Sequence, residues 1–463
     1  ETKAADPVAA GLRNIQETYP EVGITREGDS FVATVKEEPV FRFKEGKEKG
    51  GEDYWGDRVA ITLIRIERAL AEQNAVSLAE LADTFIEGIT NSLDPYSGYQ
   101  SPRKIESNRR RSHSKPGTLA IRVRPEDSGL RIVQVYNADV LGSGHLRRDD
   151  LIVEVDGVST AGINKNTFHG LLRGAVGSPI VLAVLRSGNT RPLTMTLQRD
   201  KDDAKAVAAI PDANIQRIVL VRFHKRMVHD LRDLLYDLKH DASPAEGVIL
   251  DLRNNPGGLL DSVVSTADFF LTEERILSTH GRHKDSHQNF IASSTPPVIG
   301  QPLVVLVDQD SAAGSEIVTA ALQDNDRAVV VGTATFGKGT IQTILPLPNR
   351  GALGLSWVED RTPSGYRLDK RGVMPTVCTG GEKTVDDILA DLHNGGGVID
   401  SAIRNRDIDP EDTVAVEAFR ALCPPRSDGD EDTALKVARA ILADPALYKA
   451  ILERGGSVTA ANR

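Results

Sequence analysis

A turn of small residues and a lysine further along the chain suggest the chemistry of this sequence. Residues 311–316 read Ser-Ala-Ala-Gly-Ser-Glu, and Lys338 stands in the run 335–340, Thr-Phe-Gly-Lys-Gly-Thr. A serine hydroxyl cleaves a peptide bond when a base removes its proton, and a neutral lysine can be that base. Burial next to an apolar side chain such as Phe336 favours the neutral lysine. The two segments contain the residue types that such a hydrolysis requires, but by themselves they do not decide for it.

A third segment, residues 251–258, can supply groups that stabilise the oxyanion of such a reaction. It reads Asp-Leu-Arg-Asn-Asn-Pro-Gly-Gly and lies between a predicted strand and a predicted helix. The backbone N–H groups of Gly257 and Gly258, together with that of Gly314, are suited to bind an oxyanion. Pro-Gly-Gly is also common turn chemistry. This segment therefore supports hydrolysis only in combination with residues 311–342.

Position 313 has the setting of a nucleophile, but its residue is alanine. It lies between a predicted strand that ends near Val307 and a predicted helix that starts at Ser315. The apolar stripe of that helix consists of Ile317, Val318, Ala321 and Leu322. The N-terminus of a helix stabilises negative charge. A methyl group can occupy this position but cannot attack a carbonyl carbon.

Lys338 and Gln342 are predicted to share one face of an extended segment, because side chains alternate along a strand. The alternative for a lysine between glycines is an exposed surface loop. The run 335–340 alone does not decide between a base and a surface lysine.

The three segments occur in an order that resembles the signature of the carboxy-terminal processing peptidases, which are serine endopeptidases with a serine–lysine dyad. The resemblance covers about residues 80–380 and includes Thr-Pro-Ser-Gly at 362–365. It implies that the nucleophile belongs at position 313, that Lys338 is the base and that Gln342 orients the lysine. The chain is then a serine-to-alanine variant of a complete enzyme, by engineering or by evolution.

Other residues are weaker candidates for the chemistry. Ser311 and Ser315 flank position 313, but the family's spacing to the lysine fits neither, and Ser315 is better explained as a first-turn or helix-capping serine. His280, His283 and His287 lie in a polar run that predicts an exposed hairpin. No set of four ligands accompanies these histidines, so we expect no metal and no cofactor. Asp324 is predicted to be a structural partner.

Four regions are predicted along the chain. Residues 1–112 are expected to be mainly helical, with helices over 58–73 and from a capping box at Ser77 to Leu93. Residues 201–380 alternate strands and helices, which predicts a mainly parallel sheet, and the resemblance implies a crotonase-like α/β protease core. Residues 381–463 are expected to be helical. The last helix, about 433–454, is predicted to dock on the core or on another subunit.

Residues 113–200 are predicted to form a PDZ-like domain inserted before the protease core. From the residues alone, short strands and a helix over 166–173 predict a small β-barrel-like insert, and the resemblance implies that this insert is a PDZ domain. A PDZ domain adds a peptide as an extra strand and binds its C-terminal carboxylate. The expected binding residues are Thr118, Leu119, Ala120, Ile121 and Phe168. Ala120 and the run 145–150 depart from the family's usual pattern, so a domain that only gates or braces the protease is the alternative.

Composition limits the other functions. The net charge of −10 argues against nucleic-acid binding, and no apolar run is long enough to span a membrane. The run 109–111, Arg-Arg-Arg, is expected in a linker, and an acidic patch lies at 428–432. Cys378 and Cys423 are expected either to form one disulfide or to be two unrelated buried thiols.

The resemblance therefore implies a periplasmic or otherwise exported processing endopeptidase. Because the chain begins at Glu1, we expect the signal or anchor to be absent from it. The expected partners are proteins or peptides with accessible C-termini, an adaptor protein and further copies of the chain. The alternatives are a natural pseudoprotease that acts as a PDZ-based binding scaffold and an adaptor whose function lies in its helical ends.

Overall fold

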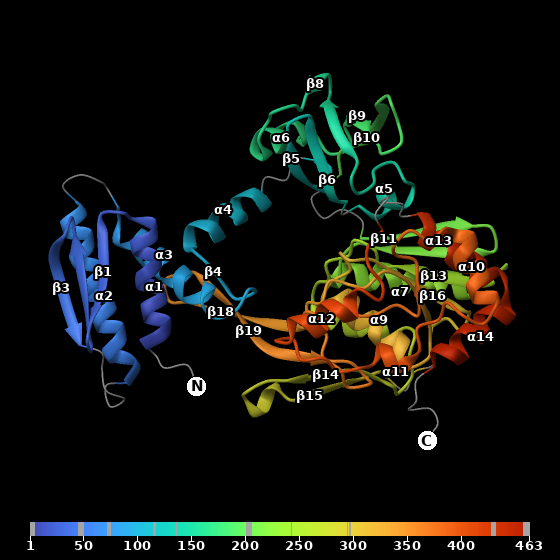
Figure 1. The fold of residues 1–463 in the computed structure, drawn as a ribbon. Coiled ribbons are helices and arrows are strands. Elements are labelled where there is room, and N and C mark those ends of the chain that lie inside the picture. Colours follow the sequence, from blue (N-terminus) through green and yellow to red (C-terminus); the bar gives the residue numbers. More distant parts are fainter. Residues whose placement is uncertain are drawn as a thin grey trace. The chain divides into compact units, whose positions relative to one another are not determined.

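The computed structural model describes residues 5–44, 51–71, 76–113, 117–135, 137–200, 206–241, 243–293, 295, 298–426 and 432–456. The chain forms two compact units (Figure 1). The first consists of Glu1–Ser114 and Ile341–Trp357, and the second of Lys115–Thr340 and Val358–Arg463. The first unit thus includes a segment, Ile341–Trp357, that follows Lys338 closely in the sequence.

The first unit contains a sheet that the sequence did not lead us to expect. Its helices are α1 (Ala5–Thr18), α2 (Gly51–Leu70), α3 (Leu78–Asn91) and α4 (Pro102–His113). An antiparallel sheet is formed by β1 (Val22–Glu27), β2 (Ser30–Val35) and β3 (Glu38–Lys44). Phe31, Val35 and Phe43 of this sheet pack against Leu12 and Ile66 of the helices. The prediction of a mainly helical region was wrong over residues 22–44, where alternating apolar residues favour strands.

The predicted start of α3 is confirmed in atomic detail. The Ser77 side chain accepts a hydrogen bond from Glu80 N, and the Glu80 carboxylate accepts one from Ser77 N. The helix ends at Asn91, two residues earlier than predicted. The Asp94 carboxylate then accepts hydrogen bonds from the N–H groups of Tyr96 and Ser97. Further along, α4 extends to His113, so the expected linker is helical as far as that residue.

Residues of the predicted PDZ-like domain form one antiparallel sheet in the order β10-β9-β7-β6-β5. The strands are β5 (Ile121–Glu126), β6 (Gly129–Val135), β7 (Leu151–Val155), β8 (Val158–Ser159), β9 (Pro179–Leu185) and β10 (Leu193–Gln198), and the helices are α5 (Ala138–Gly142) and α6 (Lys165–Leu172). The predicted strands and helix are confirmed. Asp156 and Gly157 have positive backbone φ angles (48° and 81°), which are typical of a tight turn between β7 and β8.

The protease-like core is a six-stranded sheet in the order β11-β12-β13-β16-β17-β20. Its strands are β11 (Val207–Asp212), β12 (Ile215–Leu220), β13 (Gly247–Asp251), β16 (Leu303–Val307), β17 (Val329–Gly332) and β20 (Val377–Cys378). The helices between them are α7 (Lys225–Lys239), α8 (Leu260–Asp268) and α9 (Gly314–Asp324). The strands from β12 to β20 are parallel and only β11 is antiparallel, which confirms the predicted parallel sheet.

A second sheet contains longer strands that the sequence did not reveal. It consists of β4 (Gly98–Gln100), β14 (Arg275–His280), β15 (Gln288–Ile291), β18 (Thr340–Pro346) and β19 (Ala352–Arg361). The predicted hairpin is confirmed, since β14 and β15 pair antiparallel around the short 3-10 helix η2 (Lys284–Ser286). Strand β19 pairs with β4 through residues 352–354 and with β14 through residues 359–361.

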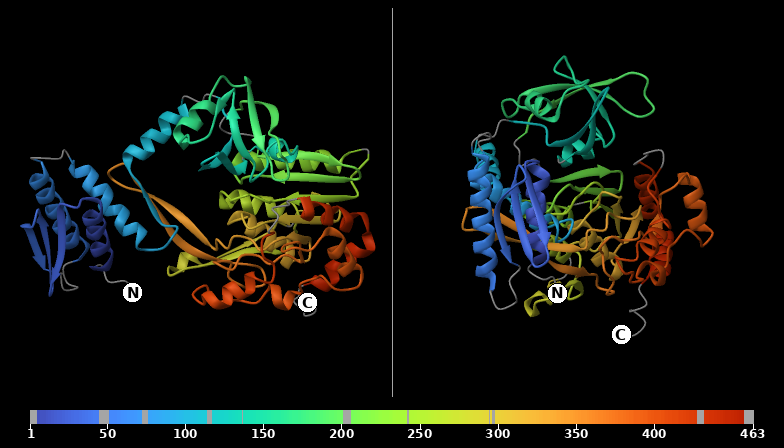
Figure 2. Two further views of the ribbon diagram at one scale, coloured as in Figure 1. Left: turned by 45° about the horizontal axis from the view of Figure 1, so that its top comes forward. Right: turned by 60° about the vertical axis from the view of Figure 1, so that its left-hand side comes forward.

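The described part of the C-terminal region is formed mainly by helices (Figures 1 and 2). They are α10 (Val385–His393), α11 (Ser401–Arg404), α12 (Thr413–Arg420), α13 (Asp432–Ala443) and α14 (Pro445–Gly455). Val437 and Ile441 of α13 and Ile451 of α14 pack with Val304 and Val329. The C-terminal segment that was predicted to dock either on the core or on another subunit therefore docks on the core. Residues 428–431 of the acidic patch lie outside the described residues.

The single helix expected at 433–454 is two helices. Asp444 ends α13 and caps α14, because its carboxylate accepts hydrogen bonds from the N–H groups of Ala446 and Leu447. Pro445 occupies the first position of α14, where a missing N–H costs nothing.

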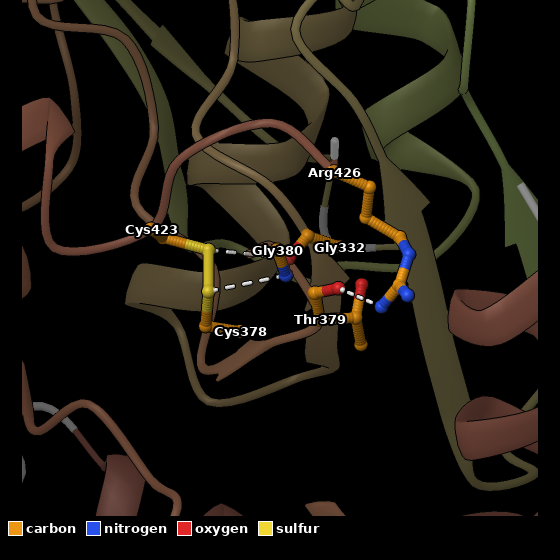
Figure 3. Close-up of a disulfide and its surroundings, with 6 residues drawn as sticks. All are labelled: Gly332, Cys378, Thr379, Gly380, Cys423 and Arg426. Atoms are coloured by element: carbon orange, nitrogen blue, oxygen red, sulfur yellow. Dashed lines mark hydrogen bonds between the residues drawn. A yellow bond between two sulfur atoms is a disulfide. The ribbon is translucent and has the colours of Figure 1, made fainter. Parts of the chain in front are cut away.

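The two cysteines form the disulfide that the sequence left open (Figure 3). Cys378 ends the edge strand β20, and Cys423 follows α12, so the bond fastens the segment after α12 to the sheet. The Cys423 sulfur lies 3.4 Å from the carbonyl oxygen of Gly332, and Gly380 N lies 3.4 Å from the Cys378 sulfur.

Among the described residues, no helix is long and apolar enough to cross a membrane.

Candidate active site

Ala313 lies at a sharp turn at the N-terminus of α9. Its backbone has φ 51° and ψ −109°, a strained conformation for a residue with a side chain. Ala313 is half-buried, whereas its neighbours Ala312 and Gly314 are buried. The turn therefore holds one side chain at a partly open position, as a nucleophile requires.

Ser311 and Ser315 brace this turn with their hydroxyl groups. Both residues are fully buried. The Ser311 hydroxyl donates to Leu252 O (2.9 Å), and the Ser315 hydroxyl donates to Asn255 O (2.8 Å). The two hydroxyls thus tie the turn of Ala313 to the glycine turn at 251–258. This arrangement explains the serines as structural residues.

The glycine turn makes close backbone contact with the turn of Ala313. A Cβ atom on Gly257, where φ is 92°, would lie 2.6 Å from Gly314 N and 3.0 Å from Ala313 Cβ. Only glycine fits there without displacement of the neighbouring backbone. The N–H of Gly257 donates to Asn255 Oδ1 (2.9 Å) and is thus used within its own turn. Of the three predicted donors, Gly258 and Gly314 therefore remain the better candidates.

The turn of Lys338 packs against the loop 368–372. A Cβ atom on Gly337 (φ 90°) would lie 2.7 Å from the carbonyl carbon of Lys370, and one on Gly339 would lie 2.1 Å from Asp369 N. These two glycines let the two stretches of backbone touch. Lys338 is half-buried, while 49% of the Phe336 surface is exposed. The expectation that Phe336 would bury the lysine was therefore wrong.

Glu316 connects the turn of Ala313 with the turn of Lys338. Its carboxylate accepts hydrogen bonds from Ala313 N (2.7 Å), Gly337 N (2.6 Å) and Lys338 N (2.9 Å). The hydroxyl of Thr335 donates to it as well (2.5 Å). Glu316 is fully buried, and this burial raises the pKa of its carboxyl despite the four donors. The sequence analysis missed this residue, although a glutamate three positions after a helix N-cap is typical of a capping box.

Asp360 is a second carboxyl that the sequence analysis missed. It is 1% exposed, and its Oδ1 has no hydrogen-bond partner among the described residues. Burial raises the pKa of Asp360 to about 8, and the charges of Glu316, Asp369 and Glu359 act in the same direction, whereas Lys338 opposes them. Asp360 and Lys338 are thus within electrostatic reach of each other. An acidic residue in a strand carries no sequence signal for such a position.

Comparisons with known proteins identify the family. Residues 214–379 match the model of peptidase family S41. Over 300 residues the chain is 35% identical to the carboxy-terminal-processing protease of Bartonella bacilliformis, a match that covers 64% of this chain and 69% of that protein. The chain belongs to peptidase family S41, with the carboxy-terminal-processing proteases.

Two further proteins match this S41 chain at lower sequence identity. The carboxy-terminal processing protease CtpA of Bacillus subtilis is 28% identical over 300 residues, which cover 64% of each protein. Among solved structures, the photosystem II D1 C-terminal processing protease matches with a TM-score of 0.45 and 22% identity, over 67% of this chain and 85% of that one.

In this S41 chain, Gln342 lies on β18 and belongs to the first unit, whereas Lys338 belongs to the second. Its predicted orientation toward the lysine stays a prediction.

The predicted peptide-binding residues of this S41 chain lie at one edge of the PDZ-like sheet. Strand β5 is the edge strand, and an edge strand can accept a further strand from a peptide. Leu119, Ile121 and Phe168 are buried together in the core of the domain. Thr118 exchanges two backbone hydrogen bonds with Asp200 (2.8 and 2.9 Å). Ala120, next to Ile121, is half-buried.

His280, His287 and Asp324 of this S41 chain make contacts that are explained by a structural role. His280 and His287 contact each other edge to face, His287 is hydrogen-bonded to Gly281 O, and burial lowers the pKa of His280. Among the described residues, no group of three His, Cys, Asp or Glu side chains is placed to hold a metal ion. The Asp324 carboxylate accepts hydrogen bonds from the backbone and hydroxyl of Ser364 (3.0 and 2.6 Å).

Proposed function

We propose that this chain is a serine endopeptidase of the carboxy-terminal processing type, which uses a Ser-Lys(-Gln) mechanism and is inactive here because position 313 is alanine. The observation that carries the proposal is the Glu316 carboxylate, which binds the backbone of Ala313 and of Lys338 at once. A second connection runs from Phe336 N to Ser311 O (3.0 Å). The two turns are thereby fixed next to each other.

In the proposed reaction, Lys338 removes the proton from a serine hydroxyl at position 313 as the oxygen attacks the carbonyl carbon of the substrate. The N–H groups of Gly258 and Gly314 donate to the oxyanion. The protonated lysine then gives the proton to the leaving amine, and an acyl-enzyme forms. Water activated by Lys338 hydrolyses this ester and restores the serine. Gln342 is proposed to orient the lysine.

The buried carboxyl of Asp360 lies within electrostatic reach of Lys338. Because the pKa of Asp360 is raised to about 8, this carboxyl is largely protonated at neutral pH. A neutral Asp360 exerts little attraction on an ammonium group. The geometry is thus compatible with a lysine that exchanges protons during the reaction.

The proposed substrates are proteins or peptides with accessible C-termini, in line with the names of the relatives. Strand β5 and the residues 118–121 with Phe168 are the proposed site for the C-terminal tail. We propose an exported, periplasmic enzyme that works with an adaptor protein and as a homo-oligomer. The net charge of −10 disfavours nucleic acid as a partner.

A natural pseudoprotease that binds tails without cutting them is the second candidate function. The observation that favours it is Ala313 itself. A binding scaffold, however, has no need of a carboxylate that fixes the turns of positions 313 and 338 against each other.

The test is to restore the hydroxyl with Ala313→Ser. We expect the variant to cleave a protein with an unfolded, apolar C-terminal tail, because the turn already holds position 313 in its strained conformation. Lys338→Ala in the same background is the control for the base. If the restored serine gives no lysine-dependent cleavage, the peptidase proposal fails and the scaffold remains.

A further inference from the structure

Arg420, the last residue of α12, binds the turn of Lys338 and lies well beyond the three motif segments in the sequence. Its Nη1 donates to Thr335 O (2.6 Å) and lies 3.3 Å from Phe336 O. The same nitrogen lies 3.2 Å from Arg371 O and 3.5 Å from Lys370 O. The four carbonyl groups belong to two stretches of backbone, the turn of Lys338 and the loop against which that turn packs.

The helix that carries Arg420 is itself fixed at both sides of this residue. The ring of Phe419 lies 4.3 Å from the guanidinium carbon of the buried Arg371, which also stacks on Tyr366 (3.7 Å). After Arg420, Cys423 is bonded to Cys378, and Cys423 O accepts a hydrogen bond from Ala334 N (3.2 Å). Figure 3 shows this disulfide next to Gly332, the last residue of β17.

We propose that Arg420 is a positioning residue for the catalytic lysine and holds the turn of Lys338 against the loop 368–372 through their carbonyl groups. The inference rests on the peptidase function proposed above. Arg420 touches carbonyl oxygens of the turn and loop, so it acts through the placement of Lys338. A guanidinium is suited to this role, because it is a rigid cation with several donors.

Electrostatics supports this placement. Burial lowers the pKa of Arg420, and the negative charge of Glu316 opposes that effect. The cation therefore lies within electrostatic reach of the carboxylate that binds the same turn. Loss of the cation would leave four carbonyl groups to water and remove a positive charge that balances Glu316.

The test compares variants of Arg420 in the Ala313→Ser background. We expect Arg420→Gln to lower kcat by about 10- to 100-fold, because small displacements of a catalytic group have effects of this size, and to leave KM within about twofold. The acid limb of the kcat–pH profile should move to higher pH, because water that enters the loosened turn favours the charged lysine. Arg420→Lys keeps the charge and should restore part of kcat.

Arg232→Gln is the matched control, since Arg232 is exposed on α7 and, within the described residues, pairs with its neighbour Asp233 (2.9 Å). It should leave kcat and the pH profile unchanged. An Arg420→Gln variant with the same kcat and pH profile as its parent would overturn the proposal.

A second measurement separates this proposal from the proposed function. In the chain with Ala313, amide hydrogen exchange is followed at residues 336–339. Arg420→Gln should speed exchange there by about tenfold or more, and Arg232→Gln should not. Unchanged exchange in Arg420→Gln overturns the holding role. If Ala313→Ser is inactive but exchange rises as expected, the peptidase function fails while the role of Arg420 in holding the turn stands.

Discussion

A single carboxylate, that of Glu316, accepts the backbone N–H groups of Ala313, Gly337 and Lys338. These three residues belong to two turns that are separated in sequence by α9 and β17. An acceptor with two oxygen atoms can bind several donors at once. One side chain therefore connects positions 313 and 338, in addition to the backbone hydrogen bond from Phe336 N to Ser311 O.

Replacement of Glu316 by glutamine tests this dependence. One carboxylate oxygen becomes an NH2 group that faces N–H donors, so at least one buried N–H loses its acceptor. We expect the free energy of unfolding to fall by about 2–4 kcal/mol, as measured by urea denaturation. Glu417→Gln, at an exposed position of α12, should have no measurable effect. Equal unfolding midpoints for the two variants would show that Glu316 does not hold the turns.

At the residue scale, the sequence predicts those functional residues whose type and spacing are typical of a known chemistry. The turn at 313, Lys338 and the glycines at 257 and 258 were found in this way. Asp360 and Arg420 were not, because their significance comes from contacts between distant parts of the chain. Neither a buried acid in a strand nor an arginine at a helix end differs, as a sequence pattern, from its exposed counterparts.

At the scale of elements, the alternation of strands and helices predicts the parallel sheet well, since each buried strand is a short apolar run. Strands of mixed composition were harder to find. β1 to β3 and β19 mix polar and apolar residues, and their pairing is decided by the helices and strands that cover them. The division of the last helix at Asp444 depends on a local capping interaction.

The disulfide offers a prediction at the scale of elements. It closes a loop in which the two cysteines are 45 residues apart, so its removal increases the entropy of the unfolded chain. We expect the double variant Cys378→Ala and Cys423→Ala to lose about 4 kcal/mol of unfolding free energy. The native chain should show two free thiols only after reduction and unfolding. The same thiol count without reductant would rule out the bond.

At the scale of the whole molecule, buried acids make stability depend on pH. The pKa of Asp360 is about 8 in the folded chain against an ordinary value of 3.8. Its contribution to stability is fully present below the ordinary value and is lost as the pH rises to about 8, because the folded state binds the proton more tightly than the unfolded state. Burial raises the pKa of Glu316 and Asp324 in the same direction.

Asp360→Asn should therefore flatten the pH dependence of unfolding. Between about pH 5 and pH 8 the native chain is expected to lose unfolding free energy on the order of 3 kcal/mol more than the variant. Glu316, Glu359, Asp369 and Lys338 face Asp360 electrostatically, so the size of the difference reports on the whole cluster. Parallel stability curves for the two proteins would show that Asp360 is not protonated in the folded chain.

The organisation of the whole chain was only partly predictable. The C-terminal helices share their hydrophobic core with the parallel sheet, and residues 341–357 join the first unit although they follow Lys338. Domain boundaries drawn along a sequence assume that each unit is continuous. Here residues 341–357 return to the first unit, and their amino-acid composition does not indicate this return.

The most direct test of the account is the initial rate at which the Ala313→Ser variant cleaves a protein with an unfolded, apolar C-terminal tail. The account predicts measurable cleavage that falls by about 1,000-fold or more when Lys338 is also replaced by alanine. No cleavage by Ala313→Ser, or the same rate with and without Lys338, would contradict it.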